Sequence, residues 1–169
     1  MKISVIVPYE GYYQYLKDCL ESLSEQENVE IETLLVGSQD DQKFQQLVDT
    51  YKDKISLNVI PCSIEEGVAK KRNLGLKNAT GDYIYFIDSD DYISDKMFEA
   101  MLGKALDMDA DIVQCGVFRV DEYGNLYKKS CVKECCLRNE SVIESFFTAS
   151  QIPVMLCNKL FKKQLISST

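Results

Sequence analysis

Short apolar runs alternate with amphipathic stretches along the chain. The apolar runs are rich in β-branched and aromatic residues and end at glycine, proline or acidic residues, which is typical of buried strands. They predict strands at residues 3–7, 31–36, 56–60, 83–87 and 112–120. The Asp-Glu-Tyr-Gly-Asn segment that follows the last run indicates a hairpin turn.

Between these runs, apolar residues recur at spacings of three and four, which places them on one face of a helix. This spacing predicts helices at residues 12–23, 44–51, 67–78, 95–107 and 139–149. Strands and helices that alternate in this way form βαβ units, so the sequence predicts an α/β fold with a mostly parallel, doubly wound sheet. The loops after parallel strands share one edge of such a sheet, which is the expected place for a ligand. The G-x-G-x-x-G fingerprint is absent, which disfavours an NAD-type site.

The loop after the fourth strand carries three carboxylates within four residues, at Asp88, Asp90 and Asp91. Side chains alternate along an extended backbone, so we expect Asp88 and Asp90 to point the same way and Asp91 the other. Two such carboxylates offer hard oxygen ligands to Mg²⁺ or Mn²⁺. The alternative is a solvated acidic turn in which Ser89, Asp91 or Ser94 caps the next helix.

Composition narrows the class of protein. A chain of 169 residues with 46% apolar residues is one domain, or most of one, with enough apolar side chains for a core. The net charge of −8 argues against nucleic acid as the main ligand and against charge-driven membrane binding. We see neither a signal peptide nor an apolar run of about 18 residues, so we expect a cytoplasmic chain without a transmembrane segment.

The chain has seven cysteines and no histidine. An odd number of cysteines without a secretory signal predicts free thiols. Cys131, Cys135 and Cys136 are close together, but they lack the C-x-x-C spacing typical of zinc sites, so free thiols are preferred there too. The lack of histidine also removes the usual general base and the Ser-His and Cys-His nucleophile arrangements.

Several segments occur in an order that resembles the family 2 glycosyltransferases of the GT-A fold. They are ISVIVP at 3–8, the YL and CLESL pieces at 15–23, GVAKKRNLGL at 67–76, ATGDY through DSDD at 79–91, DADIV at 109–113 and NKLFK at 158–162. The similarity extends from Lys2 to about Ile166. The resemblance therefore implies that residues 1–169 form a single GT-A-like nucleotide-sugar-binding domain, with helices on both faces of the sheet.

In function, the resemblance implies inverting transfer of a sugar from a nucleoside diphosphate donor, with a UDP-sugar preferred, to a hydroxyl acceptor such as a glycan in polysaccharide biosynthesis. It implies that Asp88 and Asp90 hold Mn²⁺ or Mg²⁺. Asp88 and Ser89 would contact the donor, and Asp91 would lie beside the donor sugar. A divalent cation suits this chemistry because negative charge grows on the leaving diphosphate.

The helix at 67–78 adds basic side chains near the same edge of the sheet. Arg72 lies in its first turns, from which a guanidinium can reach the donor phosphates. Lys70 and Lys71 are expected on a solvated face of this helix, because the family has small residues at these positions.

The two loops that would hold the nucleotide depart from the family pattern. The family's first loop reads Pro-x-Tyr-Asn, and its tyrosine stacks near the base; here Pro8-Tyr9-Glu10 places Glu10 at that position. The second loop reads Val-Asp-Asp-Gly-Ser in the family. Here Gly37 replaces the first aspartate, and Asp40 can serve only in a remodelled loop. These five residues remain the candidates for contacting the nucleotide, with poor base recognition expected.

The family's catalytic base is an aspartate in a Glu-Asp pair beyond the Asn-Lys-x-Phe-Lys segment. No Glu-Asp pair follows Asp91 here, and Glu134, Glu140 and Glu144 are isolated. We therefore expect the acceptor part and the base to be missing from residues 1–169, and the catalytic residue is not identified. One alternative is a catalytically degenerate module that binds nucleotide-sugars or a partner. A nucleotidyltransferase ranks last, because it would show a glycine-rich N-terminal phosphate loop with a basic residue.

Overall fold

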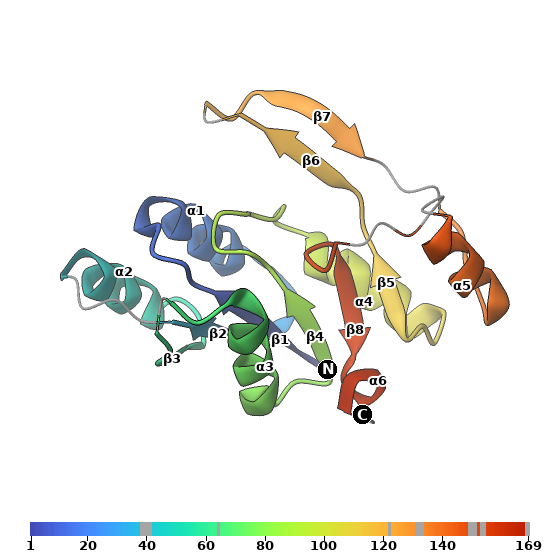
Figure 1. The fold of residues 1–169 in the computed structure, drawn as a ribbon, viewed down its shortest axis with the longest axis horizontal. Helices are drawn as coiled ribbons and strands as arrows, with labels where there is room; N and C mark the ends of the chain where they lie inside the picture. Colours follow the sequence, from blue (N-terminus) through green and yellow to red (C-terminus); the bar gives the residue numbers. More distant parts are fainter. Residues whose placement is uncertain are drawn as a thin grey trace.

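The computed structural model describes residues 1–37, 42–63, 65–121, 123–130, 134–148, 152 and 155–167. Within these residues the chain forms one large mixed sheet covered by helices, and a separate two-stranded hairpin that projects away from it (Figure 1). No helix in this part of the chain is long and apolar enough to cross a membrane.

The large sheet confirms the predicted α/β class. Its strand order is β3-β2-β1-β4-β8-β5, and β1 to β4 run parallel, whereas β8 is antiparallel to both of its neighbours. The strands are β1 (Lys2–Pro8), β2 (Glu30–Val36), β3 (Leu57–Ile60), β4 (Tyr83–Phe86), β5 (Ile112–Gln114) and β8 (Lys159–Lys162).

Helices pack on both faces of this sheet. They are α1 (Tyr13–Ser24), α2 (Gln42–Lys52), α3 (Val68–Asn78), α4 (Met97–Asp107) and α6 (Lys163–Ser167). The remaining helix, α5 (Glu140–Phe147), lies beyond β5 and contributes none of the described core residues (Figure 1). Because side chains alternate along β1, Val5 and Val7 join a core with residues of α1, α2 and α4, whereas Ile6 joins a second core with residues of α3 and α6. The loops after β1, β2 and β4 therefore extend from the part of the sheet that is buried on both faces.

Two predicted details were wrong. The strand expected at 112–120 is two strands, because β5 pairs with β8 while β6 (Val117–Val120) leaves the sheet and pairs with β7 (Leu126–Ser130). The segment at β8 was not predicted as a strand. The turn between β6 and β7 was predicted correctly, and in it the Gly124 N–H donates to the Asp121 carbonyl at 3.0 Å.

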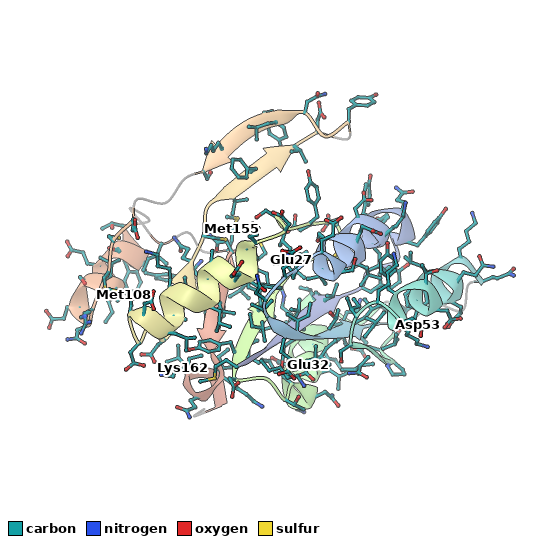
Figure 2. All side chains as sticks on the ribbon, turned by 180° about the vertical axis from the view of Figure 1, so that it is seen from behind. Glu27, Glu32, Asp53, Met108, Met155 and Lys162 are labelled. Carbon is teal, nitrogen blue, oxygen red and sulfur yellow. The ribbon has the colours of Figure 1, made fainter. Side chains whose placement is uncertain are left out.

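A buried carboxylate fastens β4 to β1 and β2 at the amino-terminal end of the sheet. Glu32, labelled in Figure 2, is 4% exposed. It accepts hydrogen bonds from the Ser4 hydroxyl and from the backbone N–H groups of Thr80 at 2.6 Å and Gly81 at 3.1 Å. Its other oxygen lies 3.0 Å from the Lys2 ammonium. Three strands are thus joined at one acid, opposite the edge that carries the functional loops.

Glu32 should make the fold sensitive to acid. Burial favours its neutral form, but hydrogen bonds from Ser4, Thr80 and Lys2 outweigh burial and lower its pKa from 4.5 to about 2. A depressed pKa means that this stabilisation is complete above about pH 4.5 and is lost as the pH falls towards 2. Glu32→Gln should cost about 2 kcal/mol of unfolding free energy at pH 7. It should also flatten the loss of stability between pH 4.5 and 2, measured by urea unfolding.

The matched control is Glu30→Gln, which changes an exposed glutamate on the same strand. This control should leave both the stability and its pH profile close to those of the parent chain. An identical acid response in the parent chain and in Glu32→Gln would contradict the assignment.

Candidate functional site

The carboxyl ends of β1, β2 and β4 lie side by side at one edge of the sheet, as expected for parallel neighbours. The loop after β1 is tied to the end of β2, because the Tyr9 N–H donates to the Val36 carbonyl at 2.9 Å. The predicted nucleotide contact at Asp40 falls at residues 38–41, which lie outside the described residues. The described part of the site therefore comprises the loops after β1 and β4 and helix α3.

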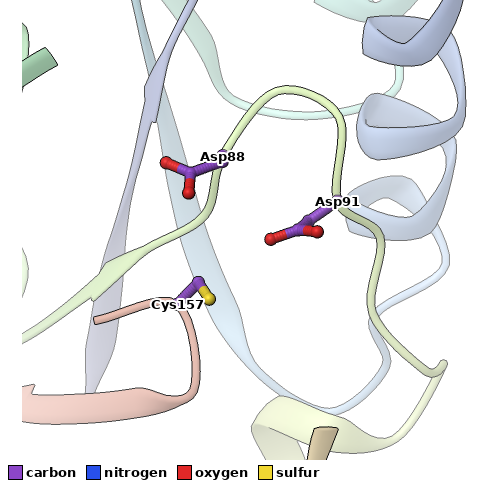
Figure 3. A group of neighbouring side chains, drawn as sticks. All are labelled: Asp88, Asp91 and Cys157. Atoms are coloured by element: carbon purple, nitrogen blue, oxygen red, sulfur yellow. The ribbon is translucent and has the colours of Figure 1, made fainter. Parts of the chain in front are cut away.

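The acidic segment after β4 is a tight turn. The Asp91 N–H donates to the Asp88 carbonyl at 3.0 Å, so the chain reverses directly after the strand. We expected an extended backbone here, with Asp88 and Asp90 pointing the same way, and this expectation was wrong. The turn brings a carboxylate oxygen of Asp88, one of Asp91 and the Cys157 sulfur within 4.8 Å of one another (Figure 3). Asp90 and Asp91 are both exposed, and the role of Asp90 as a metal ligand stays a prediction.

The acids of this turn disfavour one another's charge. The pKa of Asp91 is raised by partial desolvation of its carboxyl group and by the negative charges of Asp90 and Asp88. A hydrogen bond with Cys157 partly offsets this increase. Burial and the charges of Asp91 and Asp88 raise the pKa of the Cys157 thiol to about 11. Negative groups gathered in this way create a favourable place for a cation.

Arg72 supplies a positive charge next to the turn. Its Nη2 lies 2.6 Å from Asp88 Oδ1, in a pair that is only partly exposed. Its Nε is buried and has no hydrogen-bond partner among the described residues. The structure thus places Arg72 at the acidic turn, and its contact with donor phosphates stays a prediction.

Lys71 was expected on a solvated helix face, and this was wrong. Its side chain is fully buried, and its Nζ donates to the Tyr9 carbonyl at 2.9 Å. The spacing of Val68, Lys71 and Gly75 along α3 shows why: these residues form the stripe that faces the sheet. That spacing was visible in the sequence, but the charge of Lys71 hid it. Lys70 is exposed as expected, and it pairs with Glu66.

Comparison with known proteins decides the family. Residues 4–154 match the model described as Glycosyl transferase family 2. The chain belongs to this family.

Individual relatives agree with the assignment. The glycosyltransferase GlyG of Streptococcus pneumoniae is 29% identical over 175 residues, covering 98% of this chain and 58% of GlyG. EpsJ of Bacillus subtilis, described as an uncharacterized glycosyltransferase, is 31% identical over 117 residues, covering 69% of this chain and 34% of EpsJ. The structure of S. aureus TarS 1–349 in complex with UDP-GlcNAc superposes with a TM-score of 0.77 at 27% identity, covering 99% of this chain and 47% of the TarS 1–349 chain. The chain thus spans only part of each relative.

Within this glycosyltransferase fold, the loop that would face the base is unusual. The Tyr9 ring is fully buried and stacks on Phe44 with centroids 4.9 Å apart, so the ring cannot stack on a base in this conformation. Gly37 has a φ of +134°, and a Cβ there would lie 2.9 Å from the Tyr9 carbonyl oxygen. The backbone therefore leaves no room for the family's aspartate at this position.

The other residues predicted to contact the donor differ in accessibility. Pro8 ends β1 and is buried, and Ser89 is buried inside the acidic turn at 5% exposure. Glu10 is exposed in the loop after β1. Of these side chains, that of Glu10 is the one open to a ligand, and the role of each residue stays a prediction.

The isolated late acids do not form a catalytic group. Glu134 is exposed and pairs with Lys104, while Glu140 and Glu144 are exposed on α5. Figure 1 places α5 on the outer side of β5, away from the turn after β4. The catalytic base therefore remains unassigned within the described residues.

The cysteines agree with the free-thiol prediction as far as the structure describes them. Cys19, Cys62, Cys115, Cys136 and Cys157 are free thiols, and Cys135 is exposed. Cys131 falls at residues 131–133, outside the described part of the chain. Sequence reasoning gave no role to Cys157, which is the cysteine that reaches the acidic turn.

Proposed function

We propose that this chain binds a nucleoside diphosphate sugar through a divalent cation, as the donor half of a family 2 glycosyltransferase. The observation that carries the proposal is the convergence of Asp88 and Asp91, beside Arg72, at the carboxyl end of β4. Solved structures of the relative TarS with UDP and with UDP-GlcNAc support a UDP-sugar as donor. A glycan hydroxyl as acceptor, and inversion at the anomeric carbon, belong to the same proposal.

The donor groups at the turn suit Mn²⁺ or Mg²⁺, because both ions take carboxylate oxygens and share further positions with substrate phosphates. Asp88 and Asp91 would hold the ion, and the exposed Asp90 is a further candidate. When bound, the cation stabilises negative charge on the leaving diphosphate. Arg72 holds Asp88 in place at 2.6 Å and adds a second positive charge beside the phosphates.

Titration calorimetry with UDP tests this proposal. UDP should bind in the presence of Mn²⁺ and bind far more weakly after the metal is removed with EDTA. Asp91→Ala should weaken the Mn²⁺-dependent binding more than Asp90→Ala, because Asp91 is the acid that converges with Asp88. A UDP affinity that is the same with Mn²⁺ and after its removal with EDTA would count against the proposal.

Selectivity for the base should be poor. The Tyr9 ring is buried, and Gly37 offers no carboxylate, so neither loop position supplies the contact that the family uses. Thermal-shift measurements with UDP, GDP, CDP and TDP in Mn²⁺ should give similar increases in Tm. A shift with UDP alone would show that Glu10 or residues 38–41 restore selectivity. These same two positions favour the second candidate function, a degenerate nucleotide-sugar-binding module.

Residues 1–169 alone should show slow donor hydrolysis at most. Loss of a general base typically costs about 10²–10⁴-fold in rate. The assay is UDP release from a panel of UDP-sugars with Mn²⁺, with and without simple sugar acceptors. Acceptor-dependent turnover near ~10 s⁻¹, which is typical of enzymes, would contradict this expectation. Glutamine substitutions of Glu134, Glu140 and Glu144 would then locate the base.

A further inference from the structure

A thiol lies among the carboxylates of the acidic turn, although it comes from a distant part of the chain. Cys157 lies two residues before the start of β8, and its sulfur is within 4.8 Å of a carboxylate oxygen of Asp88 and of Asp91 (Figure 3). The pairing of the strands explains this position. β8 begins at Lys159 and runs antiparallel to β4, so the residues just before β8 lie at the carboxyl end of β4, where the acidic turn begins.

The position of Cys157 is fixed by buried neighbours on both sides. The Tyr85 hydroxyl donates to the Cys157 carbonyl, and the Tyr85 ring is buried edge-on against Phe98 at 5.1 Å. The next residue, Asn158, accepts from the Cys115 N–H at 3.0 Å and donates through Nδ2 to the Cys115 carbonyl at 3.1 Å. The thiol is thus held by the sheet at the turn.

We infer that Cys157 is a third protein ligand of the divalent cation at Asp88 and Asp91, and that it makes the site favour Mn²⁺, Co²⁺ and Cd²⁺ over Mg²⁺. The inference rests on the proposed metal-dependent binding of a nucleoside diphosphate. Metal–oxygen and metal–sulfur bonds of about 2.0–2.6 Å allow ligand atoms up to about 4–5 Å apart, so the observed spacing needs little rearrangement.

The choice of metal follows from the chemistry of the ligands. Mg²⁺ is a hard cation that takes oxygen ligands and keeps its waters, whereas thiolate sulfur suits softer transition metals. Two carboxylates and one thiolate also leave positions open for diphosphate oxygens. Cys157 binds the metal as the thiolate, and its proton passes to solvent. Arg72, paired with Asp88, offsets part of the negative charge that results.

The test records sulfur-to-metal charge-transfer absorption in the near ultraviolet while chain 1–169 is titrated with Co²⁺ or Cd²⁺. The parent chain should show a band that saturates at one metal per chain. Cys157→Ser and Cys157→Ala should both lack this band, and Asp91→Ala should weaken it. The control is Cys135→Ser, which changes an exposed cysteine and should keep the band. Circular dichroism confirms that each variant is folded.

Calorimetry with UDP provides the second measurement. The ratio of UDP affinities in Mn²⁺ and in Mg²⁺ should fall about tenfold in Cys157→Ser, with binding in Mg²⁺ retained. A band that is absent from the parent chain, or that persists in both Cys157 variants, overturns the inference. If UDP binding still depends on a metal in that case, the proposed function stands without Cys157. If UDP binding in the parent chain needs no metal, the proposed function fails and the inference fails with it.

Discussion

Asp88→Ala is expected to weaken Mn²⁺-dependent binding of UDP by about 100-fold or more. This carboxylate belongs both to the acidic cluster and to the pair with Arg72 at 2.6 Å. Its loss removes a metal ligand and also leaves a partly buried guanidinium without its acid. Loss of a group that only orients a metal ligand typically costs about 10–100-fold in metal affinity, so loss of a ligand itself should cost at least as much. Titration calorimetry in Mn²⁺ measures the effect.

The control for this substitution is Asp53→Ala. Asp53 is an exposed aspartate after α2, at the end of the molecule where Figure 2 labels it. This variant changes the net charge by the same amount and should bind UDP like the parent chain. If Asp88→Ala binds UDP as tightly as the parent chain, Asp88 is not part of the binding site. If Asp53→Ala weakens UDP binding to the same extent, the effect of Asp88→Ala comes from the change in net charge.

Gly81→Ala is expected to destabilise the fold by about 3 kcal/mol or more. A Cβ at this position would lie 2.7 Å from the Ser4 nitrogen and 2.8 Å from the Lys2 carbonyl oxygen. Both are backbone atoms of β1 and cannot rotate aside, so the entry to β4 must shift. That shift would also disturb the hydrogen bonds from the Gly81 N–H to Ser4 and Glu32. Overpacking and loss of buried hydrogen bonds each cost about 1–3 kcal/mol.

Gly103→Ala provides the contrast. This glycine lies inside α4, where a Cβ would meet nothing within 4 Å. Alanine there should stabilise the fold by about 0.5–1 kcal/mol, because glycine is unfavourable in a helix interior. Urea unfolding of both variants gives the comparison. Equal effects at the two positions would show that the close approach of Gly81 to β1 has no energetic importance.

β1 and β4 could be predicted because they are buried on both faces and read as continuous apolar runs, and the shorter runs of β2 and β3 could be predicted because they end at Gly37 and Pro61. β8 could not, since Leu160 and Phe161 lie between two lysines and the strand forms only because β4 and β5 pair with it. The division of the strand predicted at 112–120 into β5 and β6, at Cys115, has the same origin. The Cys115 N–H still donates to the Asn158 carbonyl beside β8, and two residues later the chain begins β6, which pairs with β7. Both errors come from contacts between residues far apart in the sequence.

The position of the acidic site could be predicted, but its internal arrangement could not. Three acids after an apolar strand identified the edge of the sheet, whereas the hydrogen bond that closes the turn from Asp88 to Asp91 has no sequence signal. Lys71 was misplaced because its charge was given more weight than its helical spacing. Cys157 was missed because its place depends on the register of a strand that was not predicted.

The place of β8 in the sheet also has a consequence for synthesis of the chain. β4 is buried along its whole length, with β1 on one side and β8 on the other. A ribosome completes β4 about 70 residues before β8, which takes roughly 4–15 s at ~5–20 residues per second. During this time the apolar strand Tyr83–Phe86 has one unpaired edge, which is a template for pairing with another chain. Arrival of Lys159–Lys162 closes that edge, so the strand that brings Cys157 to the acidic turn also removes the open edge of β4 from the nascent sheet.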